Sequence, residues 1–163
     1  MKAQVWSLDF AASVVIFLTA IIVAMFALNF TMAQNAQQTE FSIMENAAMA
    51  ASDSLVRLPG IPEDWNRTTV TTIGLASQEN MLNETKLAEL MAMDNDTVER
   101  LLGLGNYRLY LEVRHVNGTL ATLPAGGQIS KGEYPSDAAF IIPVQRYVLY
   151  MGKPSRMMLI LWA

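Results

Sequence analysis

The chain has 163 residues and a net charge of −4, and without a long basic stretch it offers no electrostatic basis for binding nucleic acid. It contains no cysteine, which excludes disulfides, thiolate metal sites and cysteine nucleophiles. Only 16% of its residues are charged, where a soluble domain carries about a quarter, and the deficit is local because no charged residue lies between Asp9 and Glu40.

Residues 10–33 form an apolar segment whose few polar members are Ser13, Thr19, Asn29 and Thr31. A helix needs about 20 apolar residues to cross the hydrocarbon core, so this segment is long enough to span a membrane. A secretory signal peptide would have a shorter apolar region of about 7–15 residues and a small-residue cleavage site after it. A buried core helix that is apolar on every side is unusual in so small a domain. We therefore expect a membrane-spanning or filament-core helix.

Residues 34–58 continue this helix, because they contain neither Gly nor Pro and are rich in the helix formers Ala, Met, Glu and Gln. Their apolar residues recur at steps of three and four, at Phe41, Met44, Ala48, Ala51, Leu55 and Leu58. Such spacing predicts an amphipathic stripe that packs on a sheet or on another helix. Pro59, Gly60 and Pro62 then end the helix. The sequence thus predicts one helix over residues 4–58, followed by a head domain over residues 59–163.

The first part of the head carries helical and strand patterns in turn. Residues 83–104 have apolar side chains at helical spacing and predict two short helices that separate near Asp94. Residues 107–114 alternate in the manner of a half-buried strand, with Glu112 among the residues expected to face solvent. Asn117-Gly118 follows, the strongest short hairpin signal, and residues 119–122 are the expected return strand.

The C-terminal part predicts a second hairpin, formed by residues 139–151 and 156–162 with its turn at residues 152–155. The last strand is apolar on both faces, so we expect it to be a covered central strand. Pro143 marks an edge, a bulge or the start of a strand. Together these patterns predict an α+β fold in which a long N-terminal helix packs on a small antiparallel β-sheet with one or two short helices.

The start of the chain, MKAQVWSLDF followed at once by the apolar helix, resembles the type IV pilin superfamily, specifically archaeal pilin-like proteins with class III signal peptides. The resemblance implies a structural subunit, a major or minor pilin, of an extracellular filament that polymerises through its N-terminal helix and serves in adhesion and surface attachment. In that family a prepilin peptidase removes a short basic leader on the cytoplasmic side. An assembly platform then moves the helix from the membrane into the filament core, where it meets other copies or related pilins.

The resemblance also assigns roles to residues at the N-terminus. Lys2 would be the positive charge of a leader formed by residues 1–3, Ala3 the small residue before the cut, and Gln4 the new N-terminus. A cut before Gln4 makes Asp9 the sixth residue of the mature chain, and a cut after Gln4 makes it the fifth. The family has an acidic residue near the fifth position, which neutralises the N-terminal amine of a neighbouring subunit.

Asp9 is also notable on physical grounds, since a carboxylate at the start of an apolar span must stay at the membrane interface or find a partner. We expect an assembly contact for Asp9, with a position among lipid headgroups near the helix N-terminus as the alternative. The positive charge of Lys2 favours an N-terminus in the cytoplasm. The head domain would then lie outside the cytoplasm, anchored in the membrane and, after assembly, in a cell-surface filament.

The sequence contains five Asn-X-Ser/Thr sequons. Asn29 lies inside the apolar span, where a glycosyltransferase could hardly reach it. The other four, Asn66, Asn83, Asn95 and Asn117, fall in the head and predict N-linked glycans on an outward-facing glycoprotein. The alternative is that Asn83 and Asn95 are helix caps and that Asn117 serves a tight turn.

The sequence predicts no enzyme, because one His and no Cys give no nucleophile and base to combine. It likewise predicts no cofactor and no metal site, since His115 has no neighbouring ligand residue in the sequence. The alternative function is a monomeric signal-anchored glycoprotein that acts as a binding module or envelope scaffold. The unbroken helical pattern into the head disfavours it, because an anchored receptor usually has a flexible linker there.

Overall fold

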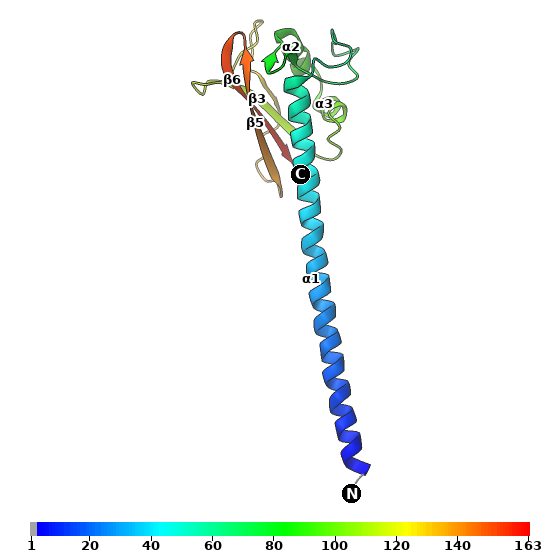
Figure 1. Cartoon of the computed structure of the whole chain (residues 1–163). Helices are drawn as coiled ribbons and strands as arrows, with labels where there is room; N and C mark the ends of the chain where they lie inside the picture. Colours follow the sequence, from blue (N-terminus) through cyan, green and yellow to red (C-terminus); the bar gives the residue numbers. More distant parts are fainter. Residues whose placement is uncertain (1–2) are drawn as a thin grey trace. The chain divides into compact units, whose positions relative to one another are not determined.

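The computed structural model describes the backbone of residues 3–163 and the side chains of residues 8–32 and 38–163. The chain has an α+β fold and forms two units, residues 1–41 and residues 42–163. The first unit is the N-terminal part of helix α1 (Ala3–Arg57), and the second, which we call the head unit, holds the last turns of α1 and everything after it (Figure 1).

Helix α1 confirms the long helix predicted over residues 4–58 and ends at Arg57, just before Leu58. Within the head unit its buried side chains keep the predicted spacing, at Met44, Ala48, Ala51 and Leu55. The predicted stripe is wrong at its two ends, because Phe41 and Leu58 are exposed. Leu58 lies beyond the last helical residue, and Phe41 belongs to the first unit.

The two short helices predicted in the head are confirmed as α2 (Glu84–Ala92) and α3 (Asn95–Leu101). The Asn83 side chain accepts hydrogen bonds from two backbone N–H groups in the first turn of α2, which is the capping role that the sequence offered as the alternative to a glycan. Asp94 caps α3 in the same way, and these hydrogen bonds hold the pKa of its carboxyl below the usual range. The cap predicted at Asn95 is therefore wrong, because Asn95 is the first helical residue.

The sheet has six strands in the order β1-β2-β5-β6-β3-β4. Their bounds are β1 Ala76–Gln78, β2 Met81–Leu82, β3 Arg108–His115, β4 Ser130–Gly132, β5 Ile141–Tyr150 and β6 Lys153–Trp162. Neighbouring strands are antiparallel except β2 and β5, which run parallel. The sheet is therefore mixed, and the prediction of an antiparallel sheet is wrong at this pair. Only two residues of β2 take part, joined to β5 where Leu149 N–H donates to the Asn80 carbonyl.

Strand β6 lies between β5 and β3, which confirms the prediction of a covered central strand. The inner face of the sheet packs with the end of α1 and with α2 and α3 in one apolar core (Figure 1). On the outer face Tyr134, from the segment that leads into β5, packs edge-on against Tyr110 with ring centroids 5.2 Å apart. Pro143 lies on the part of β5 that pairs with β6 alone, so the edge position predicted for it is confirmed.

The two predicted hairpins differ from expectation in detail. The turn at Asn117-Gly118 is present, with Gly118 at φ +86°, but residues 119–122 make isolated bridges rather than a strand. The second hairpin turns at Met151-Gly152, both with positive φ, so its predicted turn over residues 152–155 is wrong. A two-residue turn of this kind matches the twist of the flanking strands and leaves Lys153 paired in β6.

Candidate assembly helix and glycan sites

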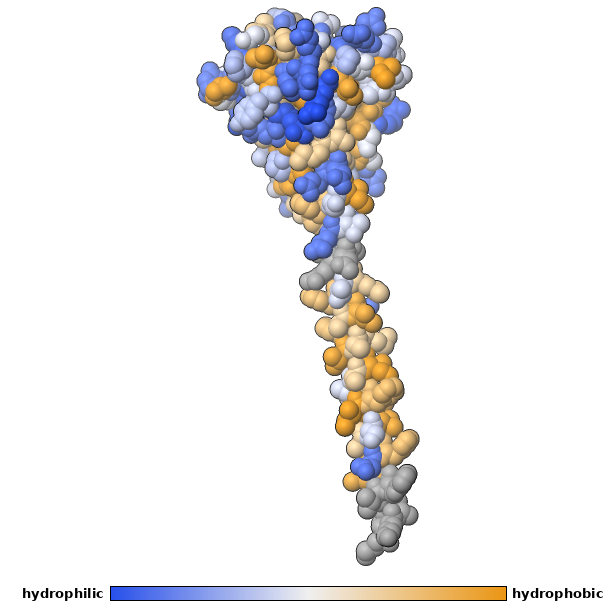
Figure 2. Space-filling view, viewed as in Figure 1, coloured by the Kyte–Doolittle hydropathy of each residue, from blue (hydrophilic) through white to orange (hydrophobic). Residues whose placement is uncertain are grey.

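The apolar part of α1, residues 8–32, is long and apolar enough to cross a membrane, and none of it is buried within the structure. On the face seen in Figure 2, apolar side chains cover most of this segment. Exposed apolar surface of this extent is not tolerated in water, so it must lie against lipid or against other apolar protein surface. The N-terminal helix therefore supports membrane anchoring.

The uncharged polar side chains within this segment are satisfied by the helix itself. Each donates a hydrogen bond of 2.8–2.9 Å to the carbonyl four residues earlier, at Ser13, Thr19, Asn29 and Thr31. A polar donor facing hydrocarbon without a partner would cost several kcal/mol. Because the backbone supplies these partners, the segment presents an apolar surface on all sides, and attraction to a neighbour depends on shape rather than on polar pairing.

One face of this segment is lined by small side chains. Ala20, Ala24 and Ala27 form a shallow groove together with Thr19, flanked by larger aliphatic residues. Small residues three and four apart let the backbone of another helix approach closely, which increases van der Waals contact. Ile22 and Phe26 carry large exposed side chains at other positions around the helix.

The residues predicted to act in processing and assembly lie at the start of α1. Asp9 is exposed, and its carboxylate has no hydrogen-bond or ion-pair partner among the residues that the structure describes. The backbone of Ala3 and Gln4 is helical, but their side chains, and all of Lys2, lie outside the described residues. The cleavage site and the assembly role of Asp9 stay predictions.

Two of the head sequons share one local geometry. Asn66 and Asn117 are exposed in turns, and the amide oxygen of each accepts hydrogen bonds from the backbone N–H and the hydroxyl of the sequon threonine. The hydroxyl bonds measure 2.6 and 2.7 Å. This arrangement leaves the side-chain nitrogen, the atom that carries an N-linked glycan, free of partners within the described part of the chain.

The remaining sequons differ in accessibility. Asn95 is exposed at the start of α3, whereas Asn83 is half-buried and occupied as the cap of α2. In the apolar segment the Asn29 side-chain nitrogen itself donates to the Met25 carbonyl, so the acceptor atom for a glycan is already used. The four head sequons lie on separate elements and form no common site.

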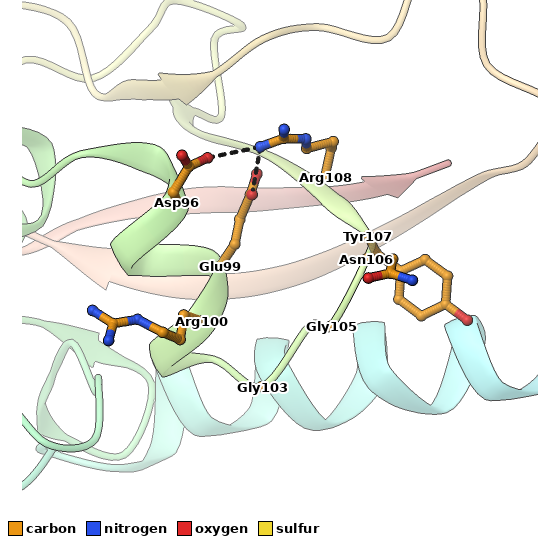
Figure 3. A pocket seen from close by; sticks show the side chains of 8 residues that line it. All are labelled: Asp96, Glu99, Arg100, Gly103, Gly105, Asn106, Tyr107 and Arg108. Atoms are coloured by element: carbon orange, nitrogen blue, oxygen red, sulfur yellow. Dashed lines mark hydrogen bonds and ion pairs between the residues drawn. The ribbon is translucent and has the colours of Figure 1, made fainter.

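A cleft of about 660 Å³ lies between α3 and the start of β3 (Figure 3). Arg108 donates to Asp96 at 2.8 Å and to Glu99 at 3.0 Å, and the other Glu99 oxygen accepts the backbone N–H that follows Arg108. The two carboxylates raise the pKa of the Arg108 guanidinium above its usual value. Arg100 and Tyr107 point away from this cluster. The single guanidinium bridges the two carboxylates and fixes α3 to β3, and the cleft shows no converging catalytic groups.

Glu112 on β3 corrects the sequence expectation of a solvent-facing side chain, because it is only 2% exposed. One carboxylate oxygen accepts from Arg114 Nε at 2.6 Å, and the other accepts from Arg114 Nη2 and from the Tyr110 hydroxyl, both at 2.9 Å. These hydrogen bonds, with Arg114 the main cause, hold the pKa of Glu112 below its usual range. An alternating polar pattern cannot reveal this burial, since Arg114 and Tyr110 sit on the same strand face and close over the carboxylate.

The single histidine, His115, lies with its Nδ1 3.0 Å from the Ser155 hydroxyl at the end of β3. Within the described ranges, no group of three or more His, Asp or Glu side chains is arranged to hold a metal ion. No protein-family model, curated protein or solved structure matches the chain. Its function therefore has to be inferred from the residues themselves.

Proposed function

We propose that this chain is a subunit of an extracellular filament of the archaeal type IV pilus kind, as a major or minor pilin used for adhesion. The observation that carries the proposal is the surface of residues 10–32, which is apolar on all sides and wholly unburied, and whose polar side chains are satisfied within the helix. The same chain folds residues 42–163 into an independent head unit. A polymer of such chains buries the helices against one another and displays the heads.

In the proposed course of assembly, each subunit is held in the membrane before it enters the filament. The helix first spans the bilayer with the head outside, and a prepilin peptidase cuts near Ala3 and Gln4. An assembly platform then transfers the helix into the filament core, where Asp9 meets a positive group of a neighbouring copy. Glycans on the head sequons would coat the outside of the filament.

Two features favour a filament over a monomeric anchor. An anchor needs only length and apolarity, so a face of small residues at Ala20, Ala24 and Ala27 adds nothing to it. A carboxylate at the start of the span, Asp9, makes insertion costlier unless it stays at the interface, and a positive partner on a neighbouring copy would offset that cost. Both features are explained if the helix packs against like helices and pairs its acidic end with a neighbour.

The proposal is tested by two substitutions that are matched in chemistry and differ in position. Ala24→Phe fills the groove of small residues, whereas Ile22→Phe alters a large exposed side chain elsewhere on the helix. Both keep the segment apolar, so both chains should enter the membrane. We expect Ala24→Phe to lower the polymer sheared from cells by about tenfold, equivalent to about 1.4 kcal/mol of lost packing per subunit, and Ile22→Phe to leave it near wild type.

A second variant, Asp9→Ala, should block incorporation without unfolding the head. The proposal fails if the wild-type chain is found only as a membrane-bound monomer, and the signal-anchored glycoprotein then takes its place. It also fails if Ala24→Phe and Asp9→Ala both polymerise like the wild type. N-terminal sequencing of the sheared material reports whether the mature chain starts at Gln4 or Val5.

A further inference from the structure

Four apolar side chains lie exposed around the turn between β5 and β6, and we call them the tip patch: Met81, Tyr147, Leu149 and Met151. Tyr147 is 74% exposed, Met151 52% and Leu149 41%. Leu149 pairs with Met81 across the parallel β2–β5 ladder, and both line a groove of about 450 Å³ together with Met151. The patch is therefore continuous across the turn and the short strand.

The position of the patch is fixed by the core beneath it. Val148 and Tyr150 alternate with Tyr147 and Leu149 along β5 and are buried on the inner face. Burial of the inner set holds the outer set toward solvent, where an antiparallel strand normally places polar residues. A rigid cluster of large apolar side chains at such positions indicates an interaction surface.

Charged side chains of both signs lie around the tip patch, and the exposed Lys153 directly follows the turn. Arg156 is the cross-strand neighbour of Tyr147 on the outer face, and Glu84, at the start of α2, lines the groove beside Leu149 and Met151. Within the described residues, neither Arg156 nor Glu84 has a hydrogen-bond or ion-pair partner. A patch with a cation on one side and a carboxylate on the other can contact a neighbouring copy in the same orientation, because the cation of one copy then faces the carboxylate of the next, as in the repeating contact of a helical filament.

We infer that the tip patch is a contact surface for a second copy of this chain, which pairs head against head. The inference rests on the proposed filament, in which many heads are held close together. Its composition fits a protein partner, since Tyr, Met and Arg are enriched in protein interfaces and Tyr and Arg among the residues that dominate binding. One tyrosine ring gives no stacked platform for a polysaccharide, and the net charge of −4 disfavours binding of nucleic acid.

The contact is tested by crosslinking on filaments of the full-length protein. The chain has no cysteine, so Tyr147→Cys gives a benzophenone maleimide a single site on this chain in sheared filaments. Irradiation should give a product of twice the chain mass that contains this chain alone. The control is Ile61→Cys, a similarly exposed apolar residue in the loop after α1, which should give little of that product.

Charge reversal then tests the proposed pairing. Arg156→Glu and Glu84→Lys should each lower the yield of the Tyr147→Cys product about tenfold, because like charges then face each other. Co-expression of the two reversed chains should restore it. Glu63→Lys, a change of charge at an exposed residue in a different groove, should leave the yield unchanged.

The inference is overturned if Tyr147→Cys links to another protein or to a polysaccharide, or if normal filaments give no crosslinked pair. It is also overturned if charge reversal leaves the yield unchanged. Failure of the proposed filament looks different, because the wild-type chain would then stay in the membrane fraction, where the same crosslinking still reports whether two heads pair.

Discussion

Removal of Arg114 tests how much this side chain stabilises the buried negative charge of Glu112. Arg114→Met keeps much of the apolar stem of the side chain but deletes two of the three hydrogen bonds that the carboxylate accepts. Glu112 remains buried, with the Tyr110 hydroxyl as its remaining partner. The variant thus leaves a charge that is desolvated and largely uncompensated.

The expected loss of stability follows from the exposure of the two partners. Breaking a fully buried ion pair costs about 3–5 kcal/mol. The Glu112 side chain is 3% exposed, but that of Arg114 is 34% exposed, so water can enter where the guanidinium was. We therefore expect a loss of about 2 kcal/mol in the free energy of unfolding at pH 7. The double variant Glu112→Leu with Arg114→Met removes both charges and should recover most of it.

The pH dependence gives a sharper test because its sign reverses. In the wild type the folded pKa of Glu112 lies below the unfolded value of about 4.5, so its stabilisation is complete above that value and is lost as pH falls through the folded pKa. In Arg114→Met burial is the largest remaining influence on Glu112, and we expect it to raise the pKa above the unfolded value against the hydrogen bond from Tyr110 and the charge of Arg156. The folded state then binds more protons, and the variant should gain stability as pH falls from 7 toward 4.5.

The measurement is urea unfolding of the full chain in mild detergent, followed by tryptophan fluorescence, to which Trp65 contributes together with Trp6 and Trp162. Trp65 is buried in the head unit and donates its indole N–H to two backbone carbonyls, so its emission reports on packing there. A loss of stability that is the same at pH 7 and pH 5 would show that Arg114 acts only by packing. A double variant as unstable as the single one would contradict the electrostatic account.

Three further predictions concern the head and its sequons. Gly132→Ala should cost about 2–4 kcal/mol in the same urea assay, because Gly132 has φ +86° and a Cβ there would overlap a carbonyl of β3; an unchanged midpoint would refute this. Lys131→Met should cost about 1 kcal/mol, because it removes the 2.6 Å hydrogen bond to the carbonyl of Met93, which follows the last residue of α2; the matched change at exposed Lys153 should cost nothing measurable. Asn66→Gln and Asn117→Gln should each lower the intact mass of protein from its native cells by one glycan, whereas Asn29→Gln should leave the glycan mass unchanged.

The elements that could be predicted from the sequence are those whose own residues carry the pattern, such as apolar spacing or capping residues. Helix α1 follows from an uninterrupted run of helix formers, and α2 and α3 follow from apolar spacing and from the capping residues Asn83 and Asp94. The β5–β6 hairpin follows from two long apolar strands around a turn. Its exact turn was missed because Gly152 and Pro154 both signal a turn, and only the register of the inner face decides that Met151-Gly152 is used.

The strands that were missed depend on distant partners. Strands β1, β2 and β4 have two or three residues each, and no periodic pattern can be read from so few. Lys131 in β4 illustrates the reason, since a lysine suggests solvent but here its stem is buried and its ammonium reaches the end of α2. The burial lowers the pKa of Lys131, which no local pattern could indicate.

The candidate sites also divide into those marked by a local sequence signal and those that only the fold reveals. Asp9 can be predicted from the sequence because it is a charged residue at the start of an apolar segment. The sequons can be predicted because each is a short motif. The tip patch was not visible, because Tyr147 and Leu149 stand in a run of mostly apolar residues in which the exposed and the buried set cannot be told apart. Only the pairing of β5 with β6 and the core below it separates the two sets.

The two proposed contacts differ in what they can contribute to a filament. An apolar helix with internally satisfied polar groups can bind its neighbours strongly, but its surface repeats every three to four residues and fixes their register weakly. A pair of opposite charges beside a small apolar patch contributes less binding energy, but it allows neighbouring heads only one position relative to each other. Ala24→Phe should therefore reduce the amount of polymer, whereas Arg156→Glu should reduce the crosslinked pair more than the polymer. If Arg156→Glu abolished the polymer and Ala24→Phe did not, the head rather than the helix would be the main source of assembly energy.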